Sequence, residues 1–486
     1  MENKMILQAF EWELSADATH WQNLTEKAQE FKEMGFSAIW LPPAYKGSKG
    51  IQDTGYGVYD YYDLGEFDQK ETIPTKYGTK EEYLQAIKAL QEKGLEVYAD
   101  IVFNHLLGAD ETETVSAVQY KENDRTNAVS EEETIEAWTK FTFPGRKGKY
   151  NDYIWTWKNF SGVDYDERTK SHAIYNLGDK GWENDVDKEE GNFDYLMGCD
   201  LDMENTETVE QLDKWGKWYQ ELTNVDGYRL DAVKHIQFDY YVDWLLHRTK
   251  ERGNAPFVVG EYWSNDQKAL ENYLDSSGNL ISLFDVPLHY NFYEASHSDG
   301  TFDMRKIFSN TLVDSREDYA VTFVDNHDTQ KGQSLESWID GWFKVHAYTL
   351  ILLRKQGIPV IFWGDVYGIP TEEVSPVGKD LELLMKLRKS MYFGNQVDYF
   401  TDSNCIGWVL TGDGKHLDSG MAIIMTNGAS QEKEMTVSAF HKGKTFVDIL
   451  GNNDQKVVLD ENGKGTFPVN DGQVSIYVQE EWARRD

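Results

Sequence analysis

Four stretches of the sequence place acidic and basic side chains at the ends of short apolar runs. They are Asp100-Ile-Val-Phe-Asn-His105, Gly227-Tyr-Arg-Leu-Asp-Ala-Val-Lys-His235, Gly260-Glu-Tyr-Trp263 and Phe323-Val-Asp-Asn-His-Asp328. A single Asp or His after a strand is more often a cap or a structural group. Two carboxyl groups about 5 Å apart, however, cleave glycosidic bonds with retention, one as nucleophile and one as acid and base. Asp231 and Glu261 end neighbouring predicted strands and are candidates for such a pair.

These stretches form one site only if the fold brings the strand ends together. The chain alternates short β-branched runs with amphipathic stretches of helix length, which is typical of repeated βα units. We predict eight strands, at 5–10, 38–41, 96–102, 227–230, 257–260, 283–286, 320–324 and 360–362, and helices that include 21–34, 80–93, 206–222, 238–251 and 338–355. Eight such units predict an α/β fold, a (β/α)8 TIM barrel, whose strands carry the chemistry at their carboxyl ends.

The repeating pattern is interrupted after the third strand. Residues 106–205 lack βα alternation, are rich in Trp, Tyr, Gly and Asp, and are too long for an ordinary loop. They predict an inserted subdomain that overhangs the active-site face, because it leaves the carboxyl end of a strand. Beyond the barrel, alternating runs predict antiparallel strands. The predicted domains are a barrel over 1–105 and 206–392, an inserted subdomain over 106–205 and a C-terminal β-sandwich over 393–486.

The four stretches resemble, in order, the signature regions of the α-amylase family, family 13 of the glycoside hydrolases. The same pattern includes Leu196-Met-Gly-Cys-Asp-Leu-Asp202, Gly55-Tyr-Gly-Val-Tyr-Asp60 and the Gly-Ile-Pro-Val-Ile-Phe-Trp-Gly run that ends at Gly364. The match covers residues 5–392, and the direct run into the first strand is similar to the intracellular bacterial liquefying-type amylases. The resemblance implies a hydrolase that cleaves internal α-1,4 bonds in starch, glycogen or maltodextrins.

The resemblance also implies roles for the three carboxyl groups. Asp231 is expected to be the nucleophile, Glu261 the acid and base, and Asp328 the group that holds the 2- and 3-hydroxyls of the distorted sugar. Glu261 must be protonated before attack, so we expect neighbouring carboxylates and exclusion of water to raise its pKa. Arg229 lies two positions before Asp231 on a strand, faces the same way, and keeps the nucleophile ionised by its charge.

Six further residues are expected to bind the glucan. They are His105, His235, His327, Lys234, Tyr56 and Trp263. By resemblance, the three histidines hydrogen-bond sugar hydroxyls and the lysine lies on the leaving-group side. The two aromatic side chains are candidate platforms for stacking glucose rings. The simpler alternative for each histidine and aromatic residue is packing in the protein core.

A calcium ion is expected where the insertion meets the barrel. Asn104, Asp194 and Asp200 supply the hard oxygen atoms that Ca2+ prefers. The family pattern places them around the ion together with the backbone carbonyl of His235. A second calcium site is not favoured, because Ser161 stands where an acidic ligand is expected.

Composition excludes several other classes of function. The 84 acidic and 48 basic residues give a formal charge of −36, which repels nucleic acid and anionic lipid. No apolar run predicts a membrane span and no signal peptide is visible, so we expect a cytoplasmic protein. Cys199 and Cys405 are the only cysteines, which excludes a disulfide framework and predicts two free thiols. We expect a monomer whose partner is an α-glucan.

Two alternatives remain at this stage. An exo-acting α-glucosidase or a glucanotransferase of the same family would use the same three carboxyl groups, because the loops around the site decide between these activities. A catalytically silent glucan-binding protein on the same barrel would be indicated by loss of one carboxyl group. All three are present in this chain.

Overall fold

The computed structural model describes residues 3–484, so residues 1–2 and 485–486 of the predicted terminal domains lie outside the described residues. Its centre is a closed parallel barrel with strand order β1-β17-β16-β15-β14-β13-β5-β2. The strands are β1 (Ile6–Gln8), β2 (Ala38–Trp40), β5 (Glu96–Ile101), β13 (Gly227–Leu230), β14 (Phe257–Gly260), β15 (Ser282–Phe284), β16 (Ala320–Phe323) and β17 (Ile358–Phe362). The predicted barrel and all eight predicted strands are confirmed.

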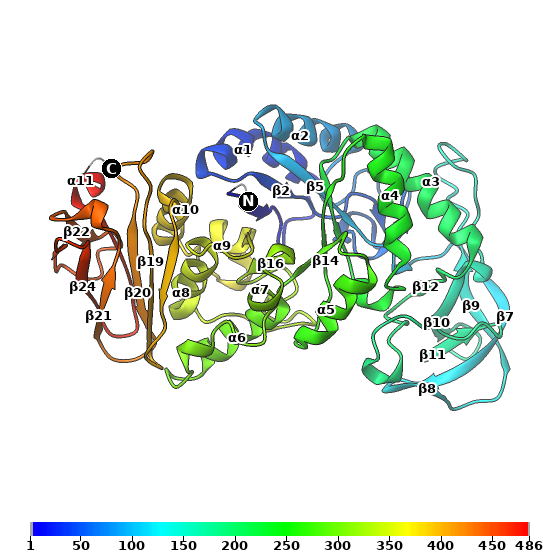
Figure 1. Cartoon of the computed structure of the whole chain (residues 1–486). Helices are drawn as coiled ribbons and strands as arrows, with labels where there is room; N and C mark the ends of the chain where they lie inside the picture. Colours follow the sequence, from blue (N-terminus) through cyan, green and yellow to red (C-terminus); the bar gives the residue numbers. More distant parts are fainter. Residues whose placement is uncertain (1–2, 485–486) are drawn as a thin grey trace.

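Helices surround this barrel (Figure 1). They are α1 (His20–Met34), α2 (Lys80–Glu92), α3 (Thr206–Thr223), α4 (Tyr240–Arg252), α5 (Gln267–Ser276), α6 (Val286–His297), α7 (Leu312–Ser315), α8 (Gly341–Leu352), α9 (Trp363–Tyr367) and α10 (Lys379–Met391). Their ends follow local sequence signals: α1 stops at Gly35 with φ of 100°, and α2 starts with a capping box between Thr79 and Glu82. No helix in the described part of the chain is long and apolar enough to cross a membrane.

Two elements differ from the sequence-based prediction in ways that matter for the site. The sixth strand stops at Phe284, and α6 begins directly because the Asp285 carboxylate accepts the N–H of Leu288 at 3.2 Å. The helix predicted from residue 338 begins instead at Gly341. The N–H of Ile339 is bonded to the Asp325 carboxylate, 3.3 Å from Oδ2, so that the chain is held in a loop up to this point.

The insertion is an antiparallel sheet with strand order β6-β12-β10-β11-β7-β8, and β9 pairs with β7 off this path. Its strands are β6 (His105–Leu106), β7 (Glu111–Lys121), β8 (Asp124–Ala128), β9 (Glu133–Lys140), β10 (Phe160–Asp166), β11 (Ser171–Leu177) and β12 (Cys199–Leu201). His105 and Asp200 are partners in the pairing of β6 with β12. The insertion therefore returns beside the point at which it leaves the barrel.

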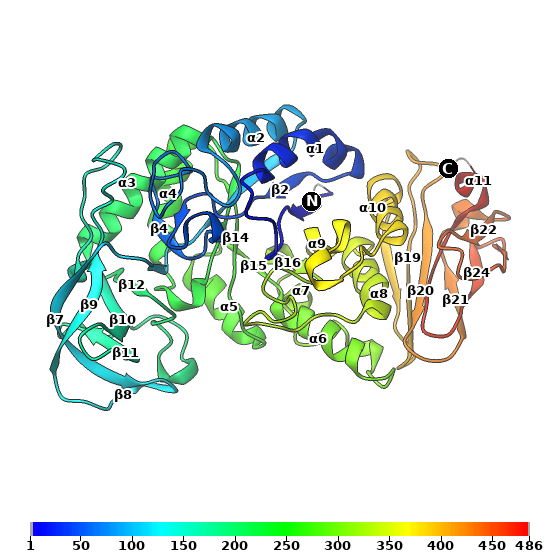
Figure 2. The same ribbon diagram turned by 180° about the vertical axis from the view of Figure 1, so that it is seen from behind.

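The C-terminal part consists of two antiparallel sheets, at the opposite end of the molecule from the insertion (Figure 2). The larger sheet contains β18 (Gln396–Tyr399), β19 (Cys405–Leu410), β20 (Met421–Thr426), β25 (Val474–Gln479), β22 (Thr445–Asp448) and β23 (Val457–Val458), and the smaller contains β21 (Gln431–Thr436) and β24 (Lys464–Val469). A short helix, α11 (Glu480–Ala483), follows the last strand. Trp408 Nε1 donates to the Leu353 carbonyl at 2.9 Å, which joins this part to the end of α8.

A hairpin after the second barrel strand, formed by β3 (Lys46–Gly47) and β4 (Val58–Asp60), is anchored by a buried lysine. Lys46 Nζ donates to three main-chain carbonyls within residues 67–73, at 2.6 to 3.0 Å, and lies 3.4 Å from Asp63 Oδ2. Both side chains are fully buried. The ammonium thus holds the segment that follows the hairpin against its base.

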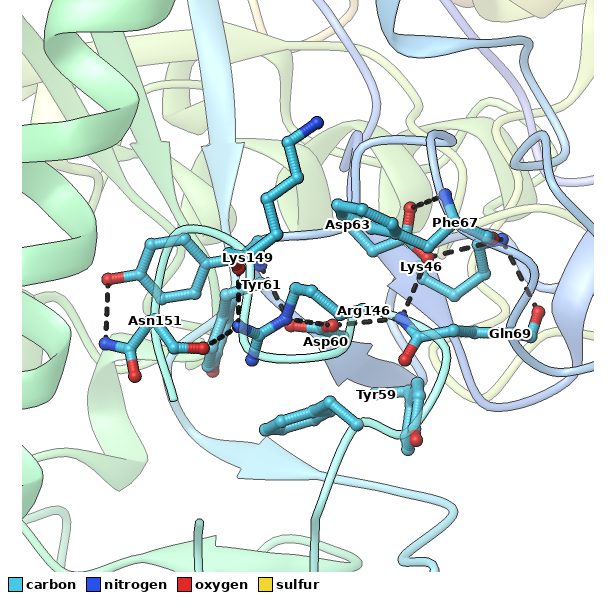
Figure 3. A network of polar contacts seen from close by, with 12 residues as sticks. Lys46, Tyr59, Asp60, Tyr61, Asp63, Phe67, Gln69, Arg146, Lys149 and Asn151 are labelled. Atoms are coloured by element: carbon cyan, nitrogen blue, oxygen red, sulfur yellow. Dashed lines mark hydrogen bonds and ion pairs between the residues drawn. The ribbon is translucent and has the colours of Figure 1, made fainter. Parts of the chain in front are cut away.

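The same cluster continues into the insertion (Figure 3). Asp60 Oδ2 accepts from Gln69 Nε2 at 3.0 Å and from Arg146 Nε at 2.9 Å, and Gln69 Nε2 also lies 2.9 Å from Asp63 Oδ2. Arg146 comes from the insertion, whereas the other residues follow the second barrel strand. Two cations and two anions are therefore paired in the interior, and together they fix the insertion to the hairpin.

Removing one member of this cluster is expected to destabilise the whole fold. Arg146→Met leaves the Asp60 carboxylate buried without its cation, which costs about 3 to 5 kcal/mol for a broken buried pair. Differential scanning calorimetry should show a lower melting temperature. The double variant Asp60→Asn with Arg146→Met removes both charges and should recover part of the loss. A single variant that melts with the wild type would show that this pair does not anchor the insertion.

Candidate active site

A cavity of about 1500 Å³ opens at the carboxyl ends of the barrel strands, between the barrel and the insertion. The predicted residues that line it are Tyr56, His105, Asp231, Lys234, His235, Glu261, Trp263 and Asp328. Arg229 and His327 are each 1% exposed and lie beside these residues. The structure therefore brings together the four sequence stretches, as expected for residues at one mouth of a barrel.

A buried guanidinium group contacts the two carboxyl groups predicted to react. Arg229 Nη1 is paired with Asp231 Oδ1 and lies 3.0 Å from Asp100 Oδ1, and its Nη2 lies 3.4 Å from Glu261 Oε2. One guanidinium therefore contacts both Asp231 and Glu261. Asp100 is the third carboxyl group around this cation.

The backbone places these two carboxyl groups on adjacent strands. The N–H of Asp231 donates to the Ile101 carbonyl at 2.9 Å, and the N–H of Glu261 donates to the Leu230 carbonyl at 2.8 Å. The main-chain hydrogen bonds between neighbouring barrel strands therefore continue as far as both residues. Ala232 then turns the chain in the left-handed region, with φ of 49°. Its N–H donates to Glu261 Oε2 at 2.9 Å, which fixes one oxygen of that carboxyl group and leaves the other available.

The environment of Glu261 favours its protonated form. Burial is the main cause that raises its pKa to about 8, a value that includes the opposing charge of Arg229 and the smaller raising effects of Asp231 and Asp328. Burial likewise raises the pKa of Asp328 to about 7. Glu261 is therefore protonated at neutral pH, which agrees with the expectation from the sequence and suits a proton donor.

Two of the predicted histidines are buried, neutral and hydrogen-bonded. His105 Nε2 donates to the Tyr56 carbonyl at 2.8 Å. His327 Nδ1 lies 3.0 Å from the amide nitrogen of Gln8, and its Nε2 lies 3.2 Å from Asp328 Oδ2. Burial lowers the pKa of both imidazoles, and the charge of Arg229 lowers that of His327 further. His327 therefore orients the carboxyl group of Asp328.

Lys234 and His235 link the barrel to the insertion at the cavity wall. Lys234 Nζ lies 2.7 Å from Glu189 Oε2 and donates to the Trp263 carbonyl at 2.9 Å. His235 Nδ1 donates to the Phe193 carbonyl at 2.7 Å. Burial, and then the charge of the neighbouring lysine, lower the pKa of His235 to about 3, so that its side chain is neutral.

Two residues that matter to this geometry were given no role by sequence reasoning, although Asp100 begins the first of the four stretches. Trp12 lines the cavity, and its ring is nearly parallel to those of Tyr56 and His327, at centroid distances of 5.9 and 5.8 Å. Asp100 accepts from Tyr56 Oη at 2.8 Å besides pairing with Arg229. The available signal for Asp100 was an acidic residue within a buried apolar strand, where a charge requires a partner. Trp12 carried no comparable signal.

The predicted calcium ligands lie together where the insertion returns to the barrel. Asn104 Nδ2 donates to Asp200 Oδ1 at 3.2 Å, and the Asn104 Oδ1 atom is buried without a hydrogen-bond partner. Burial, and then the charge of Asp194, raise the pKa of Asp200. The His235 side chain is hydrogen-bonded to the carbonyl of Phe193, the residue that precedes Asp194. Two close carboxyl groups and an orphaned amide oxygen are donors that fit a hard cation.

No group of three or more His, Cys, Asp or Glu side chains within residues 3–484 is arranged to hold a metal ion. A cation at this place would therefore depend on amide and main-chain oxygens as well as on the two carboxylates, which calcium accepts and zinc does not favour. Cys199 and Cys405 are buried free thiols.

Family models cover almost the whole chain. The model described as the alpha amylase catalytic domain matches residues 8–438, and the model of the alpha-amylase C-terminal domain matches residues 421–478. The chain belongs to the α-amylase family. The resemblance of the four sequence stretches to the signature regions of the α-amylase family is thereby confirmed.

Relatives within the α-amylase family match over nearly the full length. The α-amylase of Geobacillus stearothermophilus is 48% identical over 98% of this chain and 87% of its own length. The cytoplasmic α-amylase of Escherichia coli (strain K12) is 41% identical over 99% of this chain and 100% of its own. A solved α-amylase from Geobacillus thermoleovorans, complexed with acarbose, has a TM-score of 0.63, 19% identity and coverage of 98% and 97%, and supports the fold alone.

Proposed function

We propose that this chain hydrolyses internal α-1,4-glucosidic bonds of starch, glycogen and maltodextrins with retention of the anomeric configuration. The activity is that of an α-amylase, because relatives of that name are up to 48% identical over almost all of the chain. The observation that carries the proposed mechanism is the contact of one buried guanidinium, that of Arg229, with both Asp231 and Glu261.

Each carboxyl group has a defined part in this reaction. Asp231 attacks the anomeric carbon while protonated Glu261 gives its proton to the departing glycosidic oxygen, so that a glycosyl ester on Asp231 replaces the C–O bond. Glu261, now ionised, takes a proton from water, and the water oxygen displaces Asp231. Two inversions leave an α-anomer. Arg229 is directly paired with Asp231 and orients its carboxyl group for attack.

The remaining cavity residues hold the sugar chain. Asp328, oriented by His327, accepts hydrogen bonds from the 2- and 3-hydroxyls of the reacting sugar, and these bonds strengthen as positive charge develops on the ring. Lys234 lies on the wall formed with Glu189, where the leaving-group part of the glucan passes. Tyr56 lines the cavity and offers a ring face to a glucose unit.

Further contacts extend this binding surface. Trp263 and Trp12 also line the cavity and provide stacking faces. His105 and His235 also line the cavity, where we assign them to hydrogen bonds with sugar hydroxyls. A cavity of about 1500 Å³ holds several sugar units, which favours internal attack over removal of one terminal glucose. A silent glucan-binding protein has no use for a carboxyl group with a pKa near 8, which weighs against that alternative.

We further propose one Ca2+ ion bound by Asn104, Asp194, Asp200 and the main-chain carbonyl of His235. The ion would neutralise two buried carboxylates and join the insertion to the end of β5, without taking part in the bond cleavage. For the location of the protein we propose the cytoplasm, in line with the cytoplasmic relative of Escherichia coli.

The function is tested by the first products released from soluble starch. Proton NMR should show α-anomers at the earliest times, because double displacement retains configuration, and viscosity should fall faster than reducing ends appear. Initial β-anomers would overturn the mechanism. Slow loss of viscosity with one short sugar as the sole early product would instead place the enzyme among exo-acting hydrolases.

Three variants provide the controls for this experiment. Asp231→Asn, Glu261→Gln and Asp328→Asn should each lower turnover by several orders of magnitude while circular dichroism shows a folded chain. An Asp231→Asn protein that keeps more than about a tenth of wild-type turnover would show that another group is the nucleophile.

The rate should fall at alkaline pH because Glu261 must carry a proton. With a pKa of about 8, the fraction of protonated Glu261 drops as pH rises through that value, and kcat/KM should then fall about tenfold per pH unit. Asp328→Asn removes a negative charge that raises this pKa, so the residual activity of that variant should be lost at a lower pH. An alkaline limb that is unmoved in Asp328→Asn would contradict this assignment.

Removal of calcium should destabilise the protein. A ligand bound only by the folded state adds about 2.7 kcal/mol at a hundredfold excess over its dissociation constant, so excess chelator should lower the melting temperature. Asp200→Asn weakens the site and should melt at a temperature that chelator no longer changes. An unchanged wild-type melting curve, together with no metal by elemental analysis, would exclude the proposed ion.

A further inference from the structure

A second charged cluster lies buried beside the active site and has no part in the proposed chemistry. Lys344, on α8, is paired with Asp325 and lies 2.8 Å from Asp365 Oδ1. Tyr348, one turn later on the same helix, donates from its hydroxyl to the other oxygen of Asp365. The side chains of the lysine and of the two aspartates are all at most 4% exposed.

Asp325 closes a loop by contacting both of its ends. Its Oδ1 accepts from the hydroxyl of Thr329 at 2.7 Å, and its Oδ2 lies 3.3 Å from the N–H of Ile339. The ammonium of Lys344 contacts the same Oδ2 atom. One carboxylate therefore fixes residues 325–339 as a closed loop, and one lysine fixes that carboxylate.

This loop carries the third carboxyl group of the active site. Asn326 Oδ1 accepts the N–H groups of Asp328 and Thr329, both at 2.9 Å. Thr329 Oγ1 in turn accepts the N–H of Asn326 at 3.0 Å. The contacts thus run from Lys344 through Asp325 and Thr329 to the turn that presents Asp328. Ser334 and Leu335, further along the loop, line the same cavity.

The charges in this cluster are unequal. Two carboxylates, Asp325 and Asp365, share one ammonium, and the ring of Trp338 lies 3.6 Å from Lys344 Nζ. If the ammonium is removed, two buried carboxylates of like charge remain close together. Repulsion would then act directly on the residue that closes the loop.

We propose that Lys344 is a positioning residue for hydrolysis: through Asp325 its ammonium holds loop 325–339 so that Asp328 meets the sugar hydroxyls in the transition state. The proposal rests on the role proposed above for Asp328. A small displacement of a group that acts in the transition state lowers turnover more than it lowers ground-state binding.

The first test compares two buried lysines. Lys344→Met should lower kcat on a chromogenic maltooligosaccharide on the order of 100-fold with little change in KM. The matched control is Lys433→Met in the C-terminal sheet, where a lysine side chain that is 5% exposed is also paired with an aspartate, Asp402. It should melt at a lower temperature but keep the wild-type kcat at a temperature where both variants are folded.

Two double variants distinguish two effects of Lys344 on kcat: closing the loop through Asp325, and balancing the charge of the cluster. Lys344→Met with Asp365→Asn, and Lys344→Met with Asp325→Asn, both restore the wild-type net charge of the cluster. Only the first keeps both carboxylate oxygens of Asp325, one for Thr329 and one for Ile339, so only the first should recover kcat. This comparison also decides the matter if Lys344→Met alone does not fold. Equal kcat in the two double variants would overturn the proposal.

Asp328→Asn, measured in parallel, distinguishes this proposal from the function on which it rests. If Asp328→Asn is nearly inactive and folded Lys344→Met keeps the wild-type kcat, the positioning role is wrong and the proposed function stands. If Asp328→Asn itself keeps the wild-type kcat, the role of Asp328 fails, and the positioning role fails with it.

Discussion

The active site depends on one guanidinium group buried among carboxyl groups. Arg229 is 1% exposed, and a cation at that depth is tolerated only if anions surround it. Asp100, Asp231 and Glu261 place carboxyl groups around it from three neighbouring strand ends. Three carboxyl groups surround one guanidinium, and Glu261 is the one that is protonated, because burial raises its pKa to about 8. The same buried cluster that stabilises the arginine therefore contains Glu261, whose raised pKa suits a proton donor.

The structure isolates this cluster by several independent attachments of the insertion. Arg146 pairs with Asp60 behind the hairpin that carries Tyr56, and His105 pairs with Asp200 in the sheet at the end of β5. These attachments come from the middle of the insertion and from the point at which it returns to the barrel, so that it is held as a wall of the cavity. Low solvent access at the wall is what strengthens the electrostatic interactions of the carboxyl groups.

Much of this could be predicted from the sequence, for identifiable reasons. Strands such as Gly227–Leu230 were located exactly because they are short apolar runs followed by polar residues, and a barrel brings such ends together. The roles of Asp100 and Trp12 were not predicted, because they arise from contacts between residues far apart in the chain. The helix predicted from residue 338 was too long at its start, because its first residues are used by a buried carboxylate that local sequence does not reveal.

The pairing of β1 between β2 and β17 has a consequence for how the chain is made. Ile6 is the partner of both Ala38 in β2 and Val360 in β17. One edge of β1 therefore stays unpaired until β17 is synthesised, more than three hundred residues later. At about 5 to 20 residues per second, a ribosome needs roughly 20 to 70 s to supply it. During that interval the sheet is open and its edge strand unpaired, a form prone to association with other chains. The nascent polypeptide is therefore most vulnerable to aggregation just before its eighth strand emerges.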